Sequence, residues 1–149
     1  MAIYDLRTSF GTSLDLTGSI GTHDAGDVID LTETGLDIGD GTPKYVNIYF
    51  TTAVAPATSA INIQVQLSAT EDQTGDVFII GQTGAITSPD AGDVYSILIP
   101  PLLSKLRASH RYLGITIVVT SADVTAGAAN VHFSLTPPTN TRSYPDAVN

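Results

Sequence analysis

Cysteine and tryptophan are both absent from this chain of 149 residues. Without cysteine there is no disulfide framework, no thiolate zinc site and no thiol nucleophile, and the composition suits assembly in a reducing cytoplasm. Basic residues are also scarce, since fifteen Asp and Glu face six Lys and Arg and give a formal net charge of −9. A surface of this sign repels phosphate backbones, so we expect no nucleic-acid partner.

Long apolar runs and catalytic motifs are missing as well. No stretch of eighteen apolar residues occurs, and residues 1–10 lack the features of a signal peptide, so we expect no membrane partner. His23, His110 and His132 share no metal-ligand spacing, and no serine lies in a GxSxG motif. Ser109 and His110 are adjacent, but on a strand their side chains would face opposite ways. We therefore predict no enzyme, no metal centre and no cofactor.

The abundant residues are Thr, Val, Ile, Gly, Asp and Pro, which together are typical of short strands joined by turns. The clearest alternation is at 61–67, where Ile, Ile, Val and Leu alternate with Asn and Gln, as in a strand with one buried and one wetted side. About eight short strands are predicted in all, including 27–31, 45–50, 61–67, 77–80, 94–99, 112–120 and 130–136.

The length is that of one domain with two flanking arms. Residues 1–26 are rich in Thr, Ser and Gly and predict an N-terminal arm with at most one short strand, near 13–17. Residues 27–136 form the predicted domain, with helical spacing only at 102–106. Residues 137–149 contain three prolines and few apolar side chains, so an extended C-terminal arm is expected there.

A short internal repeat divides the domain. Asp24–Val28 (DAGDV) recurs unchanged as Asp90–Val94, and each copy opens a predicted strand. The repeat is explained either by reuse of a good turn sequence or by two similar halves folded against each other. Two Greek keys forming a jelly roll would give the second pattern.

The segment 35–43 is an acidic, glycine-rich excursion between two strands. Asp37 and Asp40 place two carboxylates there, with Asp30 and Glu33 nearby, and oxygen-rich loops are what calcium requires. The spacing does not match a helical calcium loop, and aspartate equally favours turns and a soluble surface. Asp37 and Asp40 are thus calcium candidates that also have a simple structural explanation.

Three of the six basic residues, Lys105, Arg107 and Arg111, lie within seven positions of one another. They form either a solvated loop or a docking patch that meets carboxylates on a neighbouring protein. Tyr4 and Tyr144 lie on the predicted arms, where an aromatic side chain suggests an anchor in a partner. These five residues are the candidate capsid or oligomer interface in the interpretation that follows.

Several motifs resemble the small capsid cement (decoration) proteins of tailed bacteriophages. They are VIDL at 28–31, DIGDGTP at 37–43 with the strand that follows, RYLGITIVV at 111–119 and TAGAANVHFSL at 125–135. The resemblance implies an all-β, jelly-roll β-sandwich of about eight short antiparallel strands with extended arms. It also implies a dimer or trimer, made in the host cytoplasm, that binds the outer surface of the capsid and bridges major capsid protein subunits. It implies no catalytic residues.

Two other classes of jelly-roll protein remain as alternatives. A carbohydrate-binding module of a phage tail or fibre would have similar strands and acidic loops, although such sites usually stack sugars on exposed Trp or Tyr and this chain has no Trp. A cupin-type enzyme would need clustered His and Glu on strands, and the sequence contains no such cluster.

Overall fold

The computed structural model describes residues 9–32, 44–100 and 109–134. All regular secondary structure in these ranges is β-strand, as the composition predicts. The strands are β1 (Ser9–Asp15), β2 (Gly21–Asp30), β3 (Lys44–Ala55), β4 (Ala60–Ser68), β5 (Val77–Gln82), β6 (Ile86–Thr87), β7 (Val94–Ile99), β8 (Tyr112–Thr120) and β9 (Ala126–Ser134).

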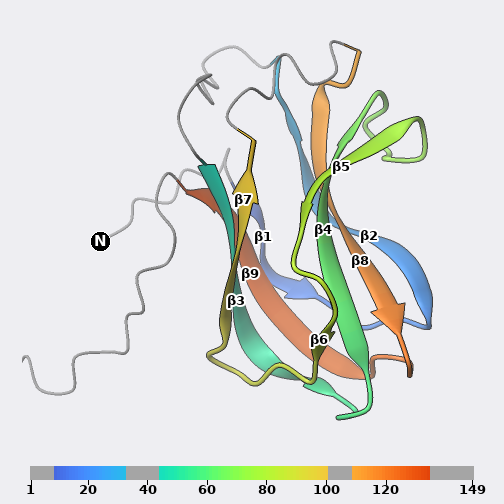
Figure 1. Ribbon diagram of the computed structural model, residues 1–149, viewed down its shortest axis with the longest axis vertical. Helices are drawn as coiled ribbons and strands as arrows, with labels where there is room; N and C mark the ends of the chain where they lie inside the picture. Colours follow the sequence, from blue (N-terminus) through green and yellow to red (C-terminus); the bar gives the residue numbers. More distant parts are fainter. Residues whose placement is uncertain (1–8, 33–43, 101–108, 135–149) are drawn as a thin grey trace, which may run out of the picture.

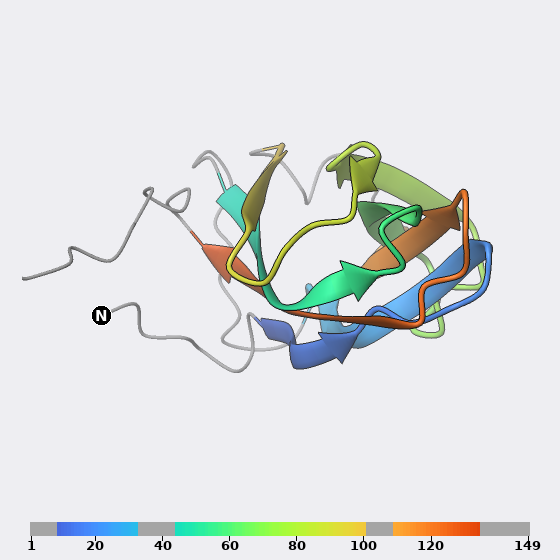
Figure 2. The ribbon, with the colours of Figure 1, turned by 90° about the horizontal axis from the view of Figure 1, so that it is seen from below.

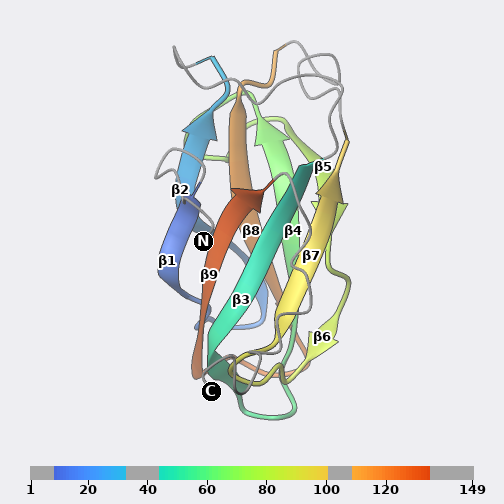
Figure 3. The ribbon, with the colours of Figure 1, turned by 90° about the vertical axis from the view of Figure 1, so that its left-hand side faces the viewer.

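The strands form two antiparallel sheets packed face to face (Figure 1). The four-stranded sheet has the order β1-β9-β3-β7 and is seen face on in Figure 3. The five-stranded sheet has the order β2-β8-β4-β5, with the two-residue β6 paired to β4, and Figure 2 shows the two layers from below. Consecutive strands alternate between the sheets except for β4, β5 and β6, which all lie in the five-stranded sheet, and the two strand orders are those of a jelly roll. The predicted jelly-roll β-sandwich is confirmed.

The internal repeat has a counterpart in this topology. The two halves can be compared by matching β2 with β7, β3 with β8 and β4 with β9. Under this matching, the order β9-β3-β7 of the four-stranded sheet becomes β4-β8-β2, which is the order found in the five-stranded sheet. The two glycines of the repeat, Gly26 and Gly92, both have positive φ, 75° and 96°. Gly26 lies within β2 at a shift of register, whereas Gly92 lies in the turn before β7. The two halves therefore share topology and one backbone conformation.

The core lies between the sheets and follows the period of two that a strand imposes. Ile61, Ile63, Val65 and Leu67 of β4 are fully buried, as the alternation at 61–67 predicts. The inward residues of β3 and β8 supply much of the rest of the core; they are Val46, Ile48, Phe50, Leu113, Ile115, Ile117 and Val119. Each such side chain contributes roughly 1.5–3 kcal/mol by leaving water.

The expected arm over residues 1–26 is wrong for its described part. Residues 9–26 contain β1 and the first half of β2, and Phe10 and Leu16 are buried in the core. The Phe10 ring lies 6.0 Å from that of Phe133. The sequence pattern is irregular because β1 pairs with β9 through two register shifts and Ser13 has φ 52°, so its apolar residues do not alternate.

Two strand boundaries also differ from expectation. β3 continues through residues 51–55, beyond the predicted strand at 45–50, because Val54 is still buried in the core. β9 begins at Ala126, four residues before the expected start, since small residues can pair in a sheet without giving an apolar pattern. The stretch with helical spacing at 102–106 lies outside the described residues.

Candidate functional site

Most of the residues that the sequence singles out lie outside the described ranges. They are Tyr4, Asp37, Asp40, Lys105, Arg107 and Tyr144. The structure therefore does not test the calcium candidates, the aromatic anchors or two thirds of the basic cluster. Of the five candidate interface residues, Arg111 is the one that lies within the described ranges.

Arg111 makes an ion pair within the chain. Its Nε donates a hydrogen bond to Asp30 Oδ1 at 3.2 Å, its Nη2 donates to Asp30 Oδ2, and its guanidinium lies 4.8 Å from the centre of the Tyr112 ring. These hydrogen bonds, with two from the backbone N–H and hydroxyl of Thr32, lower the pKa of Asp30 to about 2. Arg111 thus ties the end of β2 to the start of β8. A carboxylate of a partner protein would have to bind Arg111 together with Asp30.

Ser109, His110 and Asp76 lie together at the same end of the sandwich. Ser109 Oγ lies 3.0 Å from His110 Nδ1, so the expectation that these neighbours do not pair is wrong. The reason is that both residues precede β8 and are not on a strand. His110 Nε2 lies 3.3 Å from Asp76 Oδ2 but makes no aligned hydrogen bond. The group therefore lacks the alignment of a serine–histidine–aspartate relay, and we interpret the buried His110 ring as a structural tie.

Within the described ranges, no group of three or more His, Cys, Asp or Glu side chains could hold a metal ion. Across the same residues, no helix is long and apolar enough to span a membrane.

Exposed large apolar side chains are concentrated on two strands. Val77 and Ile79 on β5 are 41% and 47% exposed, and Val94 and Leu98 on β7 are 41% and 59% exposed. Ile20, between β1 and β2, is the fifth such residue among those described. β5 and β7 are edge strands that lie along the same side of the sandwich (Figure 1). The two pairs project from opposite outer faces, because β5 and β7 belong to different sheets.

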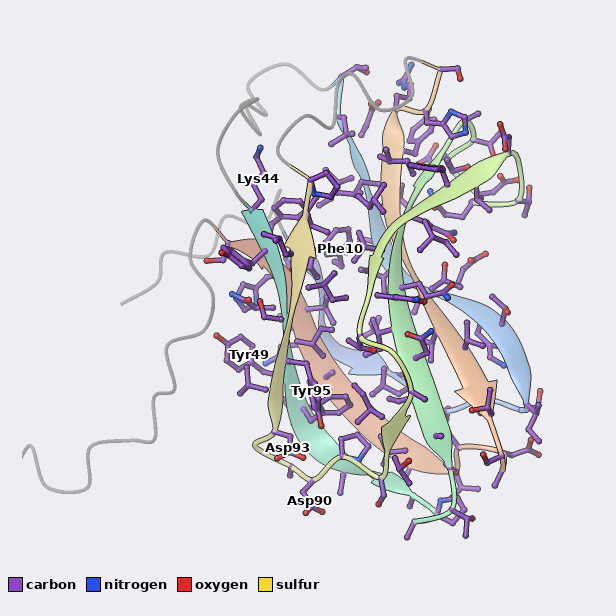
Figure 4. The ribbon with its side chains drawn as sticks, viewed as in Figure 1. Phe10, Lys44, Tyr49, Asp90, Asp93 and Tyr95 are labelled. Atoms are coloured by element: carbon purple, nitrogen blue, oxygen red, sulfur yellow. The ribbon has the colours of Figure 1, made fainter. Side chains whose placement is uncertain are left out.

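The outer face of the four-stranded sheet carries no charged side chain over three neighbouring strands. Register aligns Tyr45 with Leu98 and Tyr49 with Val94, and places β9 on the other side of β3. Figure 4 shows Tyr49 pointing away from the core on this face. We call this surface the neutral face; its residues are Tyr45, Asn47 and Tyr49 of β3, Val94, Ser96 and Leu98 of β7, and Asn130, His132 and Ser134 of β9.

The middle of the neutral face is fixed by its own contacts. Ser96 Oγ donates a hydrogen bond to Asn47 Oδ1 at 2.9 Å, and the rings of Tyr49 and His132 stack at 5.2 Å with an interplanar angle of 5°. Asn47 and His132 are buried, and burial lowers the pKa of His132. The imidazole is therefore neutral at pH 7, and the face keeps its lack of charge.

The outer face of the five-stranded sheet is different in chemistry. The loop 69–76 turns back over it, and the Gln73 side chain covers Gly114 and accepts a hydrogen bond from Gln66 Nε2 at 3.2 Å. This loop carries three carboxylates, and the last of them, on Asp76, immediately precedes Val77. The apolar pair on β5 therefore lies beside a cluster of negative charge.

Sequence reasoning did not identify the neutral face as a unit. The available signal was the absence of charge from 45–50, 94–99 and 126–134. Only the topology brings these three segments side by side.

The described residues form a small jelly-roll domain with an uncharged, partly apolar face on its four-stranded sheet. The family model Bbp16 matches residues 18–133, from just after β1 to near the end of β9. This match covers most of the chain, and the chain therefore belongs to the Bbp16 family. No curated protein matches it significantly.

Proposed function

We propose that this protein is a structural virion protein of the capsid cement, or decoration, type. In this role it binds the outer surface of an assembled phage capsid and stabilises the shell by bridging major capsid protein subunits, as a dimer or trimer. The motifs that resemble the cement proteins support the proposal, and the described ones lie at the end of β2, in β8 and in β9. The jelly-roll fold is compatible with it, although a fold alone does not determine function.

The observation that carries the proposal is the exposed apolar surface on an uncharged sheet face of a strongly acidic protein. Val94 and Leu98 project from the neutral face, next to two half-buried tyrosines. Depletion of charge and enrichment of aromatic side chains are typical of the centres of protein interfaces. An isolated domain exposes such a surface at a cost in solubility, so its presence favours a partner protein.

A cement protein acts through association free energy. Because it binds the assembled shell and not the separated subunits, each copy stabilises the shell by mass action, by about 2.7 kcal/mol when its free concentration is a hundred times Kd. Repetition of the same contact over a symmetric shell adds these contributions.

The test is an add-back experiment. Purified protein is mixed with expanded capsids that lack it, the capsids are sedimented, and the bound copies and the temperature of shell rupture are recorded. We expect saturable binding in a fixed ratio to the major capsid protein and a higher rupture temperature. Absence of binding to expanded capsids would contradict the proposal.

A carbohydrate-binding role is the second candidate, and the neutral face is the observation that favours it. Tyr45 and Tyr49 could stack on sugar rings, and the exposed Ser96 is an uncharged hydrogen-bonding group of the kind that meets hydroxyls. Screening the protein against a glycan array distinguishes this role, since a cement protein should bind capsids without selecting a glycan.

A further inference from the structure

We propose that the neutral face, chiefly at its β7 edge, is the surface that contacts the major capsid protein. This inference rests on the proposed function and assigns its partner to one of the two outer faces. The alternative is the outer face of the five-stranded sheet, where β5 presents an apolar pair of similar exposure. Three observations favour the β7 side.

The first observation is the distribution of charge. The described carboxylates lie on the rest of the molecule: Asp15 ends β1, three belong to β2, three to the loop 69–76, two to the turn before β7 and Asp123 to the turn after β8. Ionised side chains lose hydration when an interface forms, and an unpaired carboxylate there is costly. The neutral face can be covered without that loss, whereas covering Val77 and Ile79 brings the partner beside Glu71, Asp72 and Asp76.

The second observation is the character of the sheet edges. β1 is interrupted by two register shifts, and β2 carries three aspartates and a register shift, which are devices that protect exposed edges. β7 pairs only with β3 and has the sequence VYSILI, with no charge, proline or bulge inside it. Because exposed edges are normally protected, the lack of protection indicates that β7 is covered by a partner in the assembled state.

The third observation is that the face is already ordered. The hydrogen bond from Ser96 to Asn47 and the stack of Tyr49 on His132 hold the side chains around β7 in place. A partner therefore spends little free energy on fixing their rotamers when it binds. Val94 and Leu98 supply the exposed apolar contacts on either side of Ser96.

These features define the chemistry of the partner surface. It should be uncharged and partly apolar where it meets Val94, Ser96 and Leu98, with basic groups favoured only at one end, near Asp90 and Asp93. Because few charges lie within the contact, its affinity should depend weakly on ionic strength.

The test compares three single substitutions in the add-back assay. L98D places a carboxylate on β7 beside the other exposed apolar residue of the neutral face, and I20D is the matched control because Ile20 and Leu98 are both 59% exposed. I79D probes the opposite face. Thermal unfolding of each variant verifies the fold. We expect L98D to weaken capsid binding roughly tenfold or more, because an interface carboxylate is left unpaired, and I20D and I79D to bind within about twofold of the unchanged protein.

The outcomes separate the inference from the proposed function. If the unchanged protein fails to bind capsids, the proposed function fails. If it binds and L98D binds equally well, or I79D is the variant that loses binding, the assignment of the face is wrong. A roughly tenfold loss of affinity of the unchanged protein between 0.05 and 0.5 M salt would also contradict the assignment, because it indicates a charged contact.

Sedimentation velocity of the free protein tests whether the neutral face binds a second copy of the chain instead of the capsid. We expect L98D and the unchanged protein to have the same oligomeric state. If L98D alone dissociates into monomers, the neutral face is a contact between copies and the capsid contact lies elsewhere.

Discussion

The two copies of the DAGD sequence allow a sharp test of the packing around β2. Gly26 and Gly92 both have positive φ, so alanine at either position takes a left-handed conformation that costs about 1–2 kcal/mol. About 0.4–1 kcal/mol of this is offset because alanine restricts the unfolded chain. At Gly92 no atom lies within 4 Å of an added Cβ, and G92A should therefore lower the free energy of unfolding by about 1 kcal/mol.

Gly26 differs because it packs against β1. An added Cβ would lie 2.2 Å from the carbonyl oxygen of Phe10 and 3.1 Å from Leu14 Cδ1, so the backbones of β1 and β2 must separate. Overpacking of this kind costs a further 1–3 kcal/mol or so, which brings the expected loss for G26A to about 2–4 kcal/mol. The excess over G92A measures the contact between β1 and β2.

Urea unfolding followed by far-ultraviolet circular dichroism measures both variants. With a slope of about 1–3 kcal/mol per molar urea, G26A should have a midpoint lower than that of G92A by roughly 1 M. Equal midpoints for the two variants would refute the reasoning, since they would mean that the close approach to Phe10 does not constrain residue 26.

Three further predictions concern single groups. D30N should be less stable than the unchanged protein at neutral pH, because Asn cannot pair with Arg111 as a carboxylate does. The difference between the urea midpoints of the two proteins should disappear as the pH falls from 3.8 through about 2, because the Asp30 carboxylate is then protonated in the folded protein as well. The His132 ring should titrate below its ordinary pKa of 6.5 in an NMR experiment, with stability falling as pH drops below 6.5; a midpoint at or above 6.5 would contradict the burial. G114A should expel the Gln73 side chain, which lies 2.6 Å from an added Cβ, and lower the free energy of unfolding by about 1–2 kcal/mol; a urea midpoint equal to that of the unchanged protein would count against it.

The strands that could be predicted from the sequence are those whose inward positions are all large and apolar. β4 and β8 meet this condition, because every second residue from Ile61 to Leu67 and from Leu113 to Val119 is buried. β1 does not, since its register shifts break the alternation, and the start of β9 consists of Ala and Gly, which give no apolar signal. Bulges and small residues are therefore where the period of two fails as a guide.

The candidate surface was harder to predict than the fold for a related reason. A stretch without charge is unremarkable in one strand, and the signal appears only when β9, β3 and β7 are known to be neighbours. The pairing of Ser109 with His110 was mispredicted because it depends on whether the residues lie in a turn or on a strand, which the local sequence does not determine. Long-range topology and local backbone conformation are thus the two properties of this site that the sequence pattern did not predict.

The strand order also constrains when the molecule can fold during its synthesis. β1 and β2 leave the ribosome first, yet their only hydrogen-bonded neighbours within the sheets are β9 and β8, which are made last. The five-stranded sheet therefore lacks an interior strand until the chain has been synthesised to about residue 120, and the four-stranded sheet until about residue 134. Pairing the ends also requires closing long loops. Nascent chains should stay unfolded until late, and a stop codon before β9 should release a product that leaves β1 without a partner and is prone to aggregation.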